Sequence, residues 1–174
     1  MENNDLRLIK LNSKDLEELV TLSIKTFSDA FKHQNTLENF NHYLSTALNN
    51  EKLKKELSNP DSEFYFAKLN NKTVGYLKLN FDQAQSDFKE KNGMELERIY
   101  VLQNYQGNNL GKSLLDFTLA RAKQRKLDYV WLGVWNQNLR AIDFYKRNGF
   151  KAIGSHPFYL GSDQQTDLIM KYII

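Results

Sequence analysis

The sequence predicts an α+β protein with a mixed β-sheet, and two observations support this prediction. Strand-like and helix-like hydrophobic periodicity follow one another in the order β-α-α-β-β-β-α-β-α-β-β, which is not the regular βαβ alternation of a doubly wound sheet. The 174 residues also contain no linker, repeat or low-complexity tract. A chain of this length can bury a core of its own, so we expect a single domain over residues 1–174.

The N-terminal third of the chain is predicted to contain one strand, two long helices and a short one. Residues 5–11 alternate apolar and polar side chains, which indicates a strand. Residues 13–32 and 36–48 place apolar side chains at helical spacing, and a short charged helix at 51–58 ends before Pro60.

A β-hairpin is predicted in the middle of the chain. Strand-like runs at 62–69 and 72–81 flank two asparagines at 70–71, which are typical of a tight hairpin turn. The polar segment 82–93 is predicted to be a loop, and residues 94–102 are predicted to form a fourth strand.

The second half of the chain begins with an irregular segment, 103–110, which opens a strong helix that ends near residue 126. The apolar run 128–135 has the length of a strand and is predicted to be buried on both faces. The remaining expected elements are a short helix over 138–148 and two strands at 150–156 and 166–174.

The composition excludes several classes of site. The chain has no cysteine, so it has no disulfide, thiolate zinc site or cysteine nucleophile. No apolar run approaches the ~20 residues of a membrane span, and the acidic N-terminal segment is too poor in apolar residues for a signal peptide. We therefore expect a cytoplasmic protein with no membrane partner.

Charge is divided unevenly along the chain. Residues 1–87 carry 11 Lys and Arg against 13 Asp and Glu, whereas residues 88–174 carry 13 against 8. The net charge of +3 is too small for a dedicated nucleic-acid-binding protein, so no nucleic-acid partner is expected. The basic second half would suit an anionic cofactor, although ordinary solvated charge explains it equally well.

The segment 97–113 is the more informative of two motifs. A strand runs into a glycine-containing loop that opens a helix, where unpaired backbone N–H groups and the helix dipole favour a phosphate group. Gly107 and Gly111 allow a close approach, and Lys112 adds a positive charge. The spacing of the two glycines is one residue shorter than in a P-loop, so nucleotide hydrolysis is only a distant alternative.

The segment 134–150 contains the second motif. Asn138, Ala141 and Tyr145 fall on one face of the predicted short helix. A tyrosine at such a position, taken alone, is more often part of the core than a catalytic group.

Together the two motifs resemble the GNAT superfamily of acetyl-CoA-dependent N-acetyltransferases. The loop motif of that family, Arg/Gln-x-x-Gly-x-Gly/Ala, aligns with residues 106–111, and Asn109 stands where the family usually has glycine. Asparagine is the non-glycine residue that best tolerates a left-handed backbone, so the loop is still expected to form. The second motif is the sequence WNxNxxAxxFYxxxGF at 135–150.

The resemblance implies a GNAT-like fold, with a mixed, mostly antiparallel central sheet of six to seven strands and helices on both faces. Within the superfamily, the segments LERIYV and HPFYLGSDQQTDLIM most resemble the bacterial spermine/spermidine acetyltransferase branch.

The resemblance also implies which residues bind acetyl-CoA, the expected co-substrate. Backbone groups of Ile99, Tyr100 and Val101 would bind the pantetheine arm as an extra strand. Asn138 would touch the pantetheine or the thioester, and Tyr145 would be the general acid that protonates the leaving thiolate. The pyrophosphate would lie on the loop formed by Gln106, Gly107, Asn108, Asn109, Leu110, Gly111 and Lys112.

Two glutamates are candidates for the base that deprotonates the amine. Glu95 and Glu97 are expected on the same strand face, with Glu97 slightly preferred and a water wire as an equal alternative. Tyr100 is expected on the opposite face, where it packs. The remaining expectation is that His33, His42 and His156 are each structural or surface residues, with no metal-ligand spacing anywhere in the sequence.

The resemblance therefore predicts an enzyme that transfers an acetyl group from acetyl-CoA to a primary amine by direct attack in a ternary complex. The branch points to a small-molecule polyamine such as spermidine or spermine. Protein N-terminal or lysine acetylation and non-catalytic acyl-CoA sensing are the alternatives, and homodimer formation stays open. An acidic rim expected to attract the cationic amine would consist of Asp29, Glu38, Asp82, Asp87 and Glu90.

Overall fold

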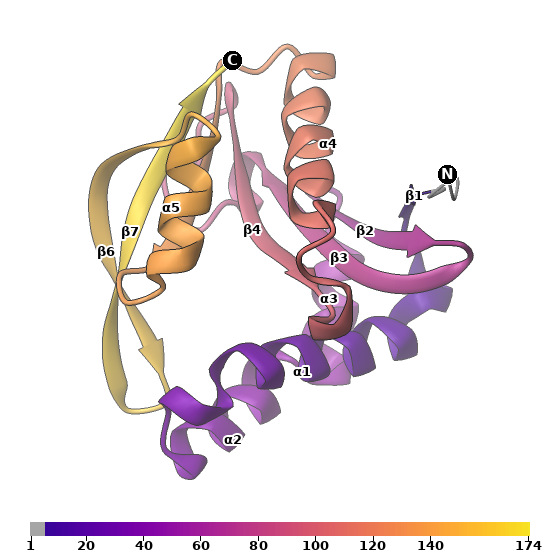
Figure 1. Cartoon of the computed structure of the whole chain (residues 1–174), viewed down its shortest axis with the longest axis vertical. Coiled ribbons are helices and arrows are strands. Elements are labelled where there is room, and N and C mark those ends of the chain that lie inside the picture. The colour runs from indigo at the N-terminus through magenta and orange to yellow at the C-terminus, as the bar shows by residue number, and fades with distance from the viewer. Residues whose placement is uncertain (1–5) are drawn as a thin grey trace.

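The protein is built on a seven-stranded mixed sheet with the strand order β1-β2-β3-β4-β5-β7-β6 (Figure 1). A computed structural model describes residues 6–174, so residue 5 of the predicted first strand and most of the acidic N-terminal segment lie outside the described residues. Only β4 and β5 run parallel, whereas every other neighbouring pair is antiparallel. The predicted α+β class and the mixed, mostly antiparallel sheet are confirmed. The strands are β1 (Leu6–Lys10), β2 (Ser62–Leu69), β3 (Lys72–Phe81), β4 (Gly93–Val101), β5 (Tyr129–Trp135), β6 (Lys151–Leu160) and β7 (Asp163–Ile173).

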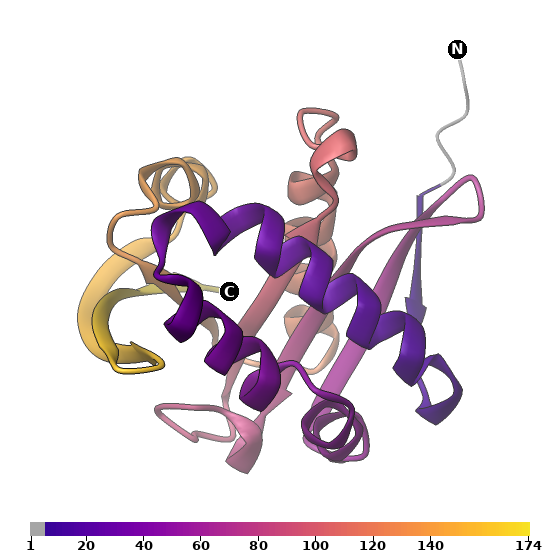
Figure 2. The same ribbon diagram turned by 90° about the horizontal axis from the view of Figure 1, so that it is seen from below.

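Helices cover both faces of the sheet, as the family resemblance implied. Figure 2 shows α1 and α2 crossing in front of the sheet. Alternate side chains of β2 face the two helical layers. Tyr65 and Ala67 pack in the cluster that contains α4, whereas Phe64 and Phe66 pack against α1 and α3. The helices are α1 (Leu16–Phe31), α2 (Leu37–Ala47) and α3 (Asn50–Leu57) on one face, and α4 (Leu110–Gln124) and α5 (Leu139–Arg147) on the other.

The β2–β3 hairpin has the turn that its sequence predicts. Asn70 and Asn71 have φ of 50° and 64°, and Leu69 pairs with Lys72 on either side of them. A two-residue hairpin turn needs positive φ at both central residues in its commonest form, and asparagine tolerates this conformation.

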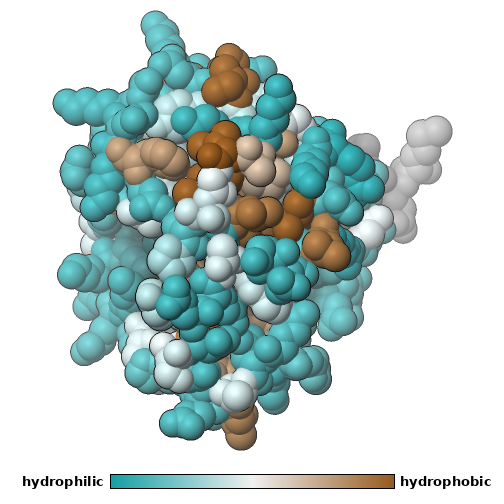
Figure 3. Space-filling model, turned by 90° about the vertical axis from the view of Figure 1, so that its left-hand side faces the viewer, coloured by the Kyte–Doolittle hydropathy of each residue, from teal (hydrophilic) through white to brown (hydrophobic). Residues whose placement is uncertain are grey.

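The last two strands are longer than predicted. β6 extends to Leu160 and β7 begins at Asp163, so a tight turn at Gly161 (φ 63°) joins them where the sequence predicted no strand between 156 and 166. The prediction was wrong here because Pro157, which an edge strand tolerates, and the polar residues 163–165 interrupt the strand pattern in the sequence. β6 is an edge strand, and Figure 3 shows apolar side chains gathered on the side of the molecule that carries it.

Strand β4 contains a β-bulge that decides which side chains face which helices. Lys78 of β3 pairs with Arg98 and Leu79 pairs with Leu96, so Glu97 is the extra residue. Before the bulge Leu96 faces the α4 side of the sheet, and after it Ile99 faces the same side. A bulge shifts the two-residue alternation by one position.

The parallel strands β4 and β5 stay together for only a short distance. Their register contains three residue pairs, which end at Glu95 and Trp131. Beyond this point β4 diverges from the β7–β6 side of the sheet (Figure 1). The sheet is therefore split in its middle, between one half formed by β1–β4 and another formed by β5–β7.

Candidate active site

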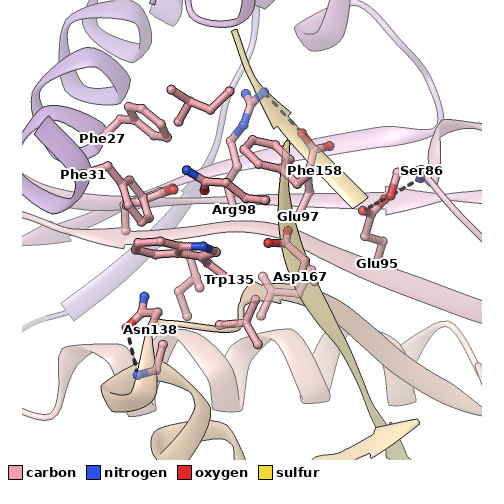
Figure 4. A pocket seen from close by; sticks show the side chains of 18 of the residues that line it. Phe27, Phe31, Ser86, Glu95, Glu97, Arg98, Trp135, Asn138, Phe158 and Asp167 are labelled. Atoms are coloured by element: carbon pink, nitrogen blue, oxygen red, sulfur yellow. Dashed lines mark hydrogen bonds and ion pairs between the residues drawn. The ribbon is translucent and has the colours of Figure 1, made fainter. Parts of the chain in front are cut away.

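The split between β4 and β5 opens into a cavity of about 590 Å³. Residues 95–100 of β4 and 133–135 of β5 line it, together with side chains from α1, α2, α5, β6 and β7. Figure 4 shows the rings of Phe27, Phe31 and Trp135 on one side of this cavity and the carboxylates of Glu97 and Asp167 across from them. The cavity thus combines aromatic walls with acidic groups.

The open edge of β4 can bind an extended ligand through its backbone. Residues 99–101 lie past the last β4–β5 pair, so β5 leaves their backbone groups on this side without a strand partner. A ligand that carries amide groups can add to such an edge as an extra strand. The side chains of Ile99 and Val101 pack into the core, so the backbone is the part of these residues that remains available.

The loop before α4 presents a helix start without a side-chain cap. Gly107 has φ of 86°, and Asn109, the N-cap residue, has φ of 58° and makes no side-chain capping bond. The expectation that asparagine adopts the left-handed conformation at this position is confirmed. A Cβ on Gly107 would have no atom within 4 Å, so the space in front of the helix is open. The first N–H groups of α4 are therefore available to an anion such as a pyrophosphate.

Other predicted loop residues fix this geometry. Gln106 Nε2 donates a hydrogen bond of 3.1 Å to the carbonyl of Val101, which ties the loop to the end of β4. Asn108 donates to a carbonyl within the loop, and the Leu110 side chain is buried. Lys112 forms an ion pair with a carboxylate one turn further along α4. These contacts leave the backbone as the main binding element of the loop.

Helix α5 brings Asn138 and Tyr145 to the cavity, as the second motif predicted. Asn138 Oδ1 caps the helix by accepting a hydrogen bond of 3.2 Å from the N–H of Ala141, which leaves its Nδ2 as a donor. The Tyr145 ring packs against Phe144 and Phe150, and its hydroxyl makes no hydrogen bond to a described residue. Burial raises the pKa of Tyr145, so its phenol keeps its proton at neutral pH.

Glu97, which lines the cavity, belongs to a cluster of ion pairs. Its carboxylate lies 2.6 Å from Lys78 Nζ and 3.2 Å from a guanidinium nitrogen of Arg98, and Glu56 of α3 contacts the same two cations. Burial raises the pKa of Glu97, but Arg98 and Lys78 outweigh this effect and lower it to about 2. A carboxylate of such low basicity is a weak proton acceptor.

Glu95 is held by hydrogen bonds rather than by cations. Ser86 donates to it from its N–H at 2.8 Å and from its hydroxyl at 2.6 Å, and Asn80 Nδ2 donates at 3.0 Å. Burial and the nearby charge of Glu97 raise the pKa of Glu95. Asn80 Nδ2 also donates to Glu97, so the two glutamates lie together as predicted.

Tyr100 does not lie on the face predicted for it. Its ring stacks on Tyr76 at 5.6 Å, on the side of the sheet covered by α1 and α2, and it lines the cavity. The prediction was wrong because it assumed unbroken alternation along β4, whereas the bulge at Glu97 shifts the pattern. Tyr100 therefore shares the cavity with Glu95 and Glu97.

The acidic rim differs from the predicted one. Of the five carboxylates expected there, Asp87 lines the cavity, whereas Asp29 pairs with Lys25 and Glu90 accepts a hydrogen bond from Tyr129. Asp167 lines the cavity and had no sequence signal. His156 also lines it, although a surface or structural role was expected. These residues come from separate loops and strands, so no spacing in the sequence could have grouped them.

The comparisons with known proteins identify the family. The family model described as Acetyltransferase (GNAT) family matches residues 17–150. The chain belongs to the GNAT acetyltransferase family. It is 37% identical to an uncharacterized N-acetyltransferase of Lactobacillus delbrueckii subsp. lactis, over 95% of this chain and 96% of that protein. It is 26% identical to a spermidine N(1)-acetyltransferase of Thermoplasma acidophilum, over 84% of this chain and 88% of that protein.

Solved structures agree with this assignment. The chain superposes on the PaiA N-acetyltransferase of Thermoplasma acidophilum in complex with coenzyme A, with a TM-score of 0.80 and 25% identity over 98% of this chain and 99% of that one. The protein is thus an N-acetyltransferase with acetyl-CoA as co-substrate, and the split sheet and the loop before α4 fit coenzyme A. The P-loop and the non-catalytic sensor hypotheses are not retained.

Two further findings bear on this acetyltransferase. Within residues 6–174, none of the helices combines the length and the apolar composition that a membrane crossing needs. The same part of the chain contains no group of three or more His, Asp or Glu side chains arranged to bind a metal ion.

Proposed function

We propose that this acetyltransferase transfers the acetyl group of acetyl-CoA to a primary amine of a polyamine such as spermidine or spermine, by direct attack in a ternary complex. The observation that carries the proposal is the combination of aromatic rings and unbalanced negative charge in the acceptor part of the cavity. A polyamine has ammonium groups separated by hydrocarbon, and both parts find complementary groups there.

The negative charge of the cavity can be assigned to particular residues. Glu56 and Glu97 pair with Lys78 and Arg98, and Lys52 also pairs with Glu56 at 3.7 Å, so this cluster has no excess of negative charge. Three other carboxylates line the cavity without a lysine or arginine partner among the described residues, namely Asp87, Glu95 and Asp167. They would attract a cation into the cavity.

The aromatic side chains complement this charge. Phe27 and Phe31 of α1 lie 4.8 Å apart between ring centroids, and Phe31 lies 6.4 Å from Trp135. An ammonium group over the face of an aromatic ring gains a cation–π interaction of about 0.5–2 kcal/mol, and the methylene groups gain apolar contact. The relative in Thermoplasma that is named a spermidine N(1)-acetyltransferase gives additional support.

The transfer step needs a hydrogen-bond donor at the leaving sulfur and another at the carbonyl oxygen. Tyr145 supplies the first, because its buried phenol stays protonated and its hydroxyl has no partner among the described residues. A backbone N–H on the unpaired stretch of β4 supplies the second and stabilises the oxyanion. The chain has no cysteine that could hold the acetyl group, which favours direct attack over a thioester intermediate on the enzyme.

The test is the release of free coenzyme A from acetyl-CoA with spermidine, a simple alkylamine and a peptide with a free N-terminus. We expect the highest kcat/KM for spermidine, and we expect its advantage to shrink at high salt because exposed charges are screened beyond about 8 Å at physiological ionic strength. Asp167→Asn should lower kcat/KM for spermidine, because Asp167 lines the cavity without a lysine or arginine partner among the described residues. Asp29→Asn is the matched control, because Asp29 pairs with Lys25 and does not line the cavity. A peptide that is preferred at both salt concentrations would refute the polyamine assignment.

A further inference from the structure

Three side chains from distant parts of the sequence meet at the wall of the cavity. His156 of β6 stands directly opposite Asp167 of β7 in the register of the two strands, and Asp87 comes from the loop between β3 and β4, 69 positions before the histidine. His156 Nδ1 is hydrogen-bonded to Asp87 Oδ2, whereas His156 Nε2 lies 3.8 Å from Asp167 Oδ2, which is too long for a hydrogen bond. All three line the same cavity.

The contact with Asp87 determines which imidazole nitrogen can accept a proton. An ionised carboxylate only accepts hydrogen bonds, so the proton of neutral His156 lies on Nδ1. Nε2 then carries the free lone pair. A gap of 3.8 Å between Nε2 and Asp167 Oδ2 leaves both atoms able to contact the same ammonium group.

The position of Nε2 relative to the split sheet gives it access to the reaction. A Cβ built on Gly133 of β5 would lie 3.2 Å from His156 Nε2 and 3.4 Å from Asp167 Oδ2, so both groups lie directly over this glycine. The β4–β5 pairing ends at Trp131, and Gly133 is therefore the second residue past the point where the strands diverge. Coenzyme A bound along the open edge of β4 would place its thioester in this same opening.

We propose that His156 is the general base that takes a proton from the acceptor ammonium, with Asp87 orienting the imidazole and Asp167 positioning the ammonium. The inference rests on the proposed function, since it requires an amine that enters the cavity as a cation. Asp87 and Asp167, on opposite sides of the ring, offset the positive charge that the imidazole acquires.

The proton balance of the reaction is complete. One N–H bond of the ammonium breaks, and its proton moves to His156 Nε2 and then to water. The free amine attacks the thioester carbonyl, the N–C bond forms, and the C–S bond breaks. The thiolate takes the phenolic proton of Tyr145, and Tyr145 is reprotonated by the second proton that the nitrogen loses. The products are an acetamide, coenzyme A as a thiol and one released proton.

The other titratable groups of the cavity are less suited to this role. Glu97 is neutralised by Lys78 and Arg98, and both oxygens of Glu95 accept hydrogen bonds from Ser86. An alkylammonium group keeps its proton to about pH 10, so it needs a base before it can attack at neutral pH. A base near Gly133 therefore provides reactive amine at neutral pH, where little of it exists in solution.

The test compares His156→Gln with wild type on two acceptors that differ in basicity but not in length: a diamine and its β,β-difluoro analogue, whose fluorines make the attacking amine much less basic. At pH 7 we expect His156→Gln to lower kcat/KM by roughly 100-fold for the diamine and by less than about fivefold for the analogue, which needs no base. The loss with the diamine should shrink as the pH approaches the amine pKa. Asp87→Asn should show the same pattern with a smaller loss.

The control variant is His42→Gln, because His42 is exposed on α2 and does not line the cavity. Affinity for coenzyme A and Tm should be unchanged in all three variants. Equal losses with both acceptors, or full activity of His156→Gln at pH 7, would overturn the assignment of His156. A wild-type preference for the peptide would instead refute the polyamine proposal, and the peptide amine would then be used in the same pH comparison.

Discussion

Replacing Tyr145 by phenylalanine removes one oxygen atom and tests the leaving-group step alone. The hydroxyl makes no hydrogen bond to a described residue, so its loss leaves no protein group unsatisfied. The ring keeps its contacts with Phe144 and Phe150, whose centroids lie 5.3 and 5.7 Å away. We therefore expect Tyr145→Phe to change the free energy of unfolding by less than about 1 kcal/mol.

The effect on catalysis should be much larger. Loss of a general acid typically lowers the rate by about 100-fold or more, which corresponds to roughly 2.7 kcal/mol in the activation free energy. The assay is steady-state thiol release at saturating amine, with coenzyme A affinity and Tm measured on the same samples. Because burial raises the pKa of Tyr145, the wild-type rate should show no alkaline loss from this phenol near pH 8. A kcat equal to that of wild type would refute the role of Tyr145, and a kcat loss with an equally large Tm loss would assign it to packing.

Three other perturbations have defined outcomes. Acetyl-CoA should raise the Tm of the wild type, and Gly111→Glu should abolish this shift because the added negative charge repels the pyrophosphate. The variant should still fold, because a Cβ at this position would lie 3.9 Å from Phe144, an ordinary contact distance. Glu97→Gln should lower the free energy of unfolding by about 2 kcal/mol at pH 7, as measured by urea titration. Burial raises the pKa of Glu97, but Arg98 and Lys78 lower it to about 2, so the ionised carboxylate stabilises the folded protein at pH values above the unfolded pKa. The difference in stability between wild type and variant should therefore vanish as the pH falls towards 2. Asn109→Val should lower stability by about 1–2 kcal/mol because a β-branched residue resists φ of 58°, whereas Asn109→Gly should not, and equal Tm values for the two variants would contradict this explanation.

Local signals in the sequence were sufficient for most of the elements and for the conformation of the loop before α4. The two asparagines of the β2–β3 turn and the loop before α4 follow from backbone preferences of single residues, which act over a few positions. Asn109 shows this most directly, because its tolerance of positive φ is a property of the residue itself.

Features that depend on partners far along the chain were not predictable in this way. The bulge at Glu97 arises from the pairing of β4 with β3, and it moved Tyr100 to the face of the sheet opposite to the predicted one. The contact of Asp87 with His156 spans 69 positions and needs the loop after β3 to reach the β6–β7 hairpin. Sequence spacing contains no information on such a contact, so only the folded chain shows that Asp87, His156 and Asp167 line one cavity.

Because β4 and β5 diverge after three residue pairs, the rest of the β4 edge has no neighbouring strand although it lies in the middle of the sheet. An unpaired edge at the border of a sheet invites association with other chains, but this edge lies inside the sheet and faces a cavity that β5 and α5 also line. A slender amide-bearing chain can still enter. If the acetyl donor binds this edge as we propose, its recognition depends on main-chain atoms that every residue possesses, and side chains such as Ile99 can change for packing without loss of affinity.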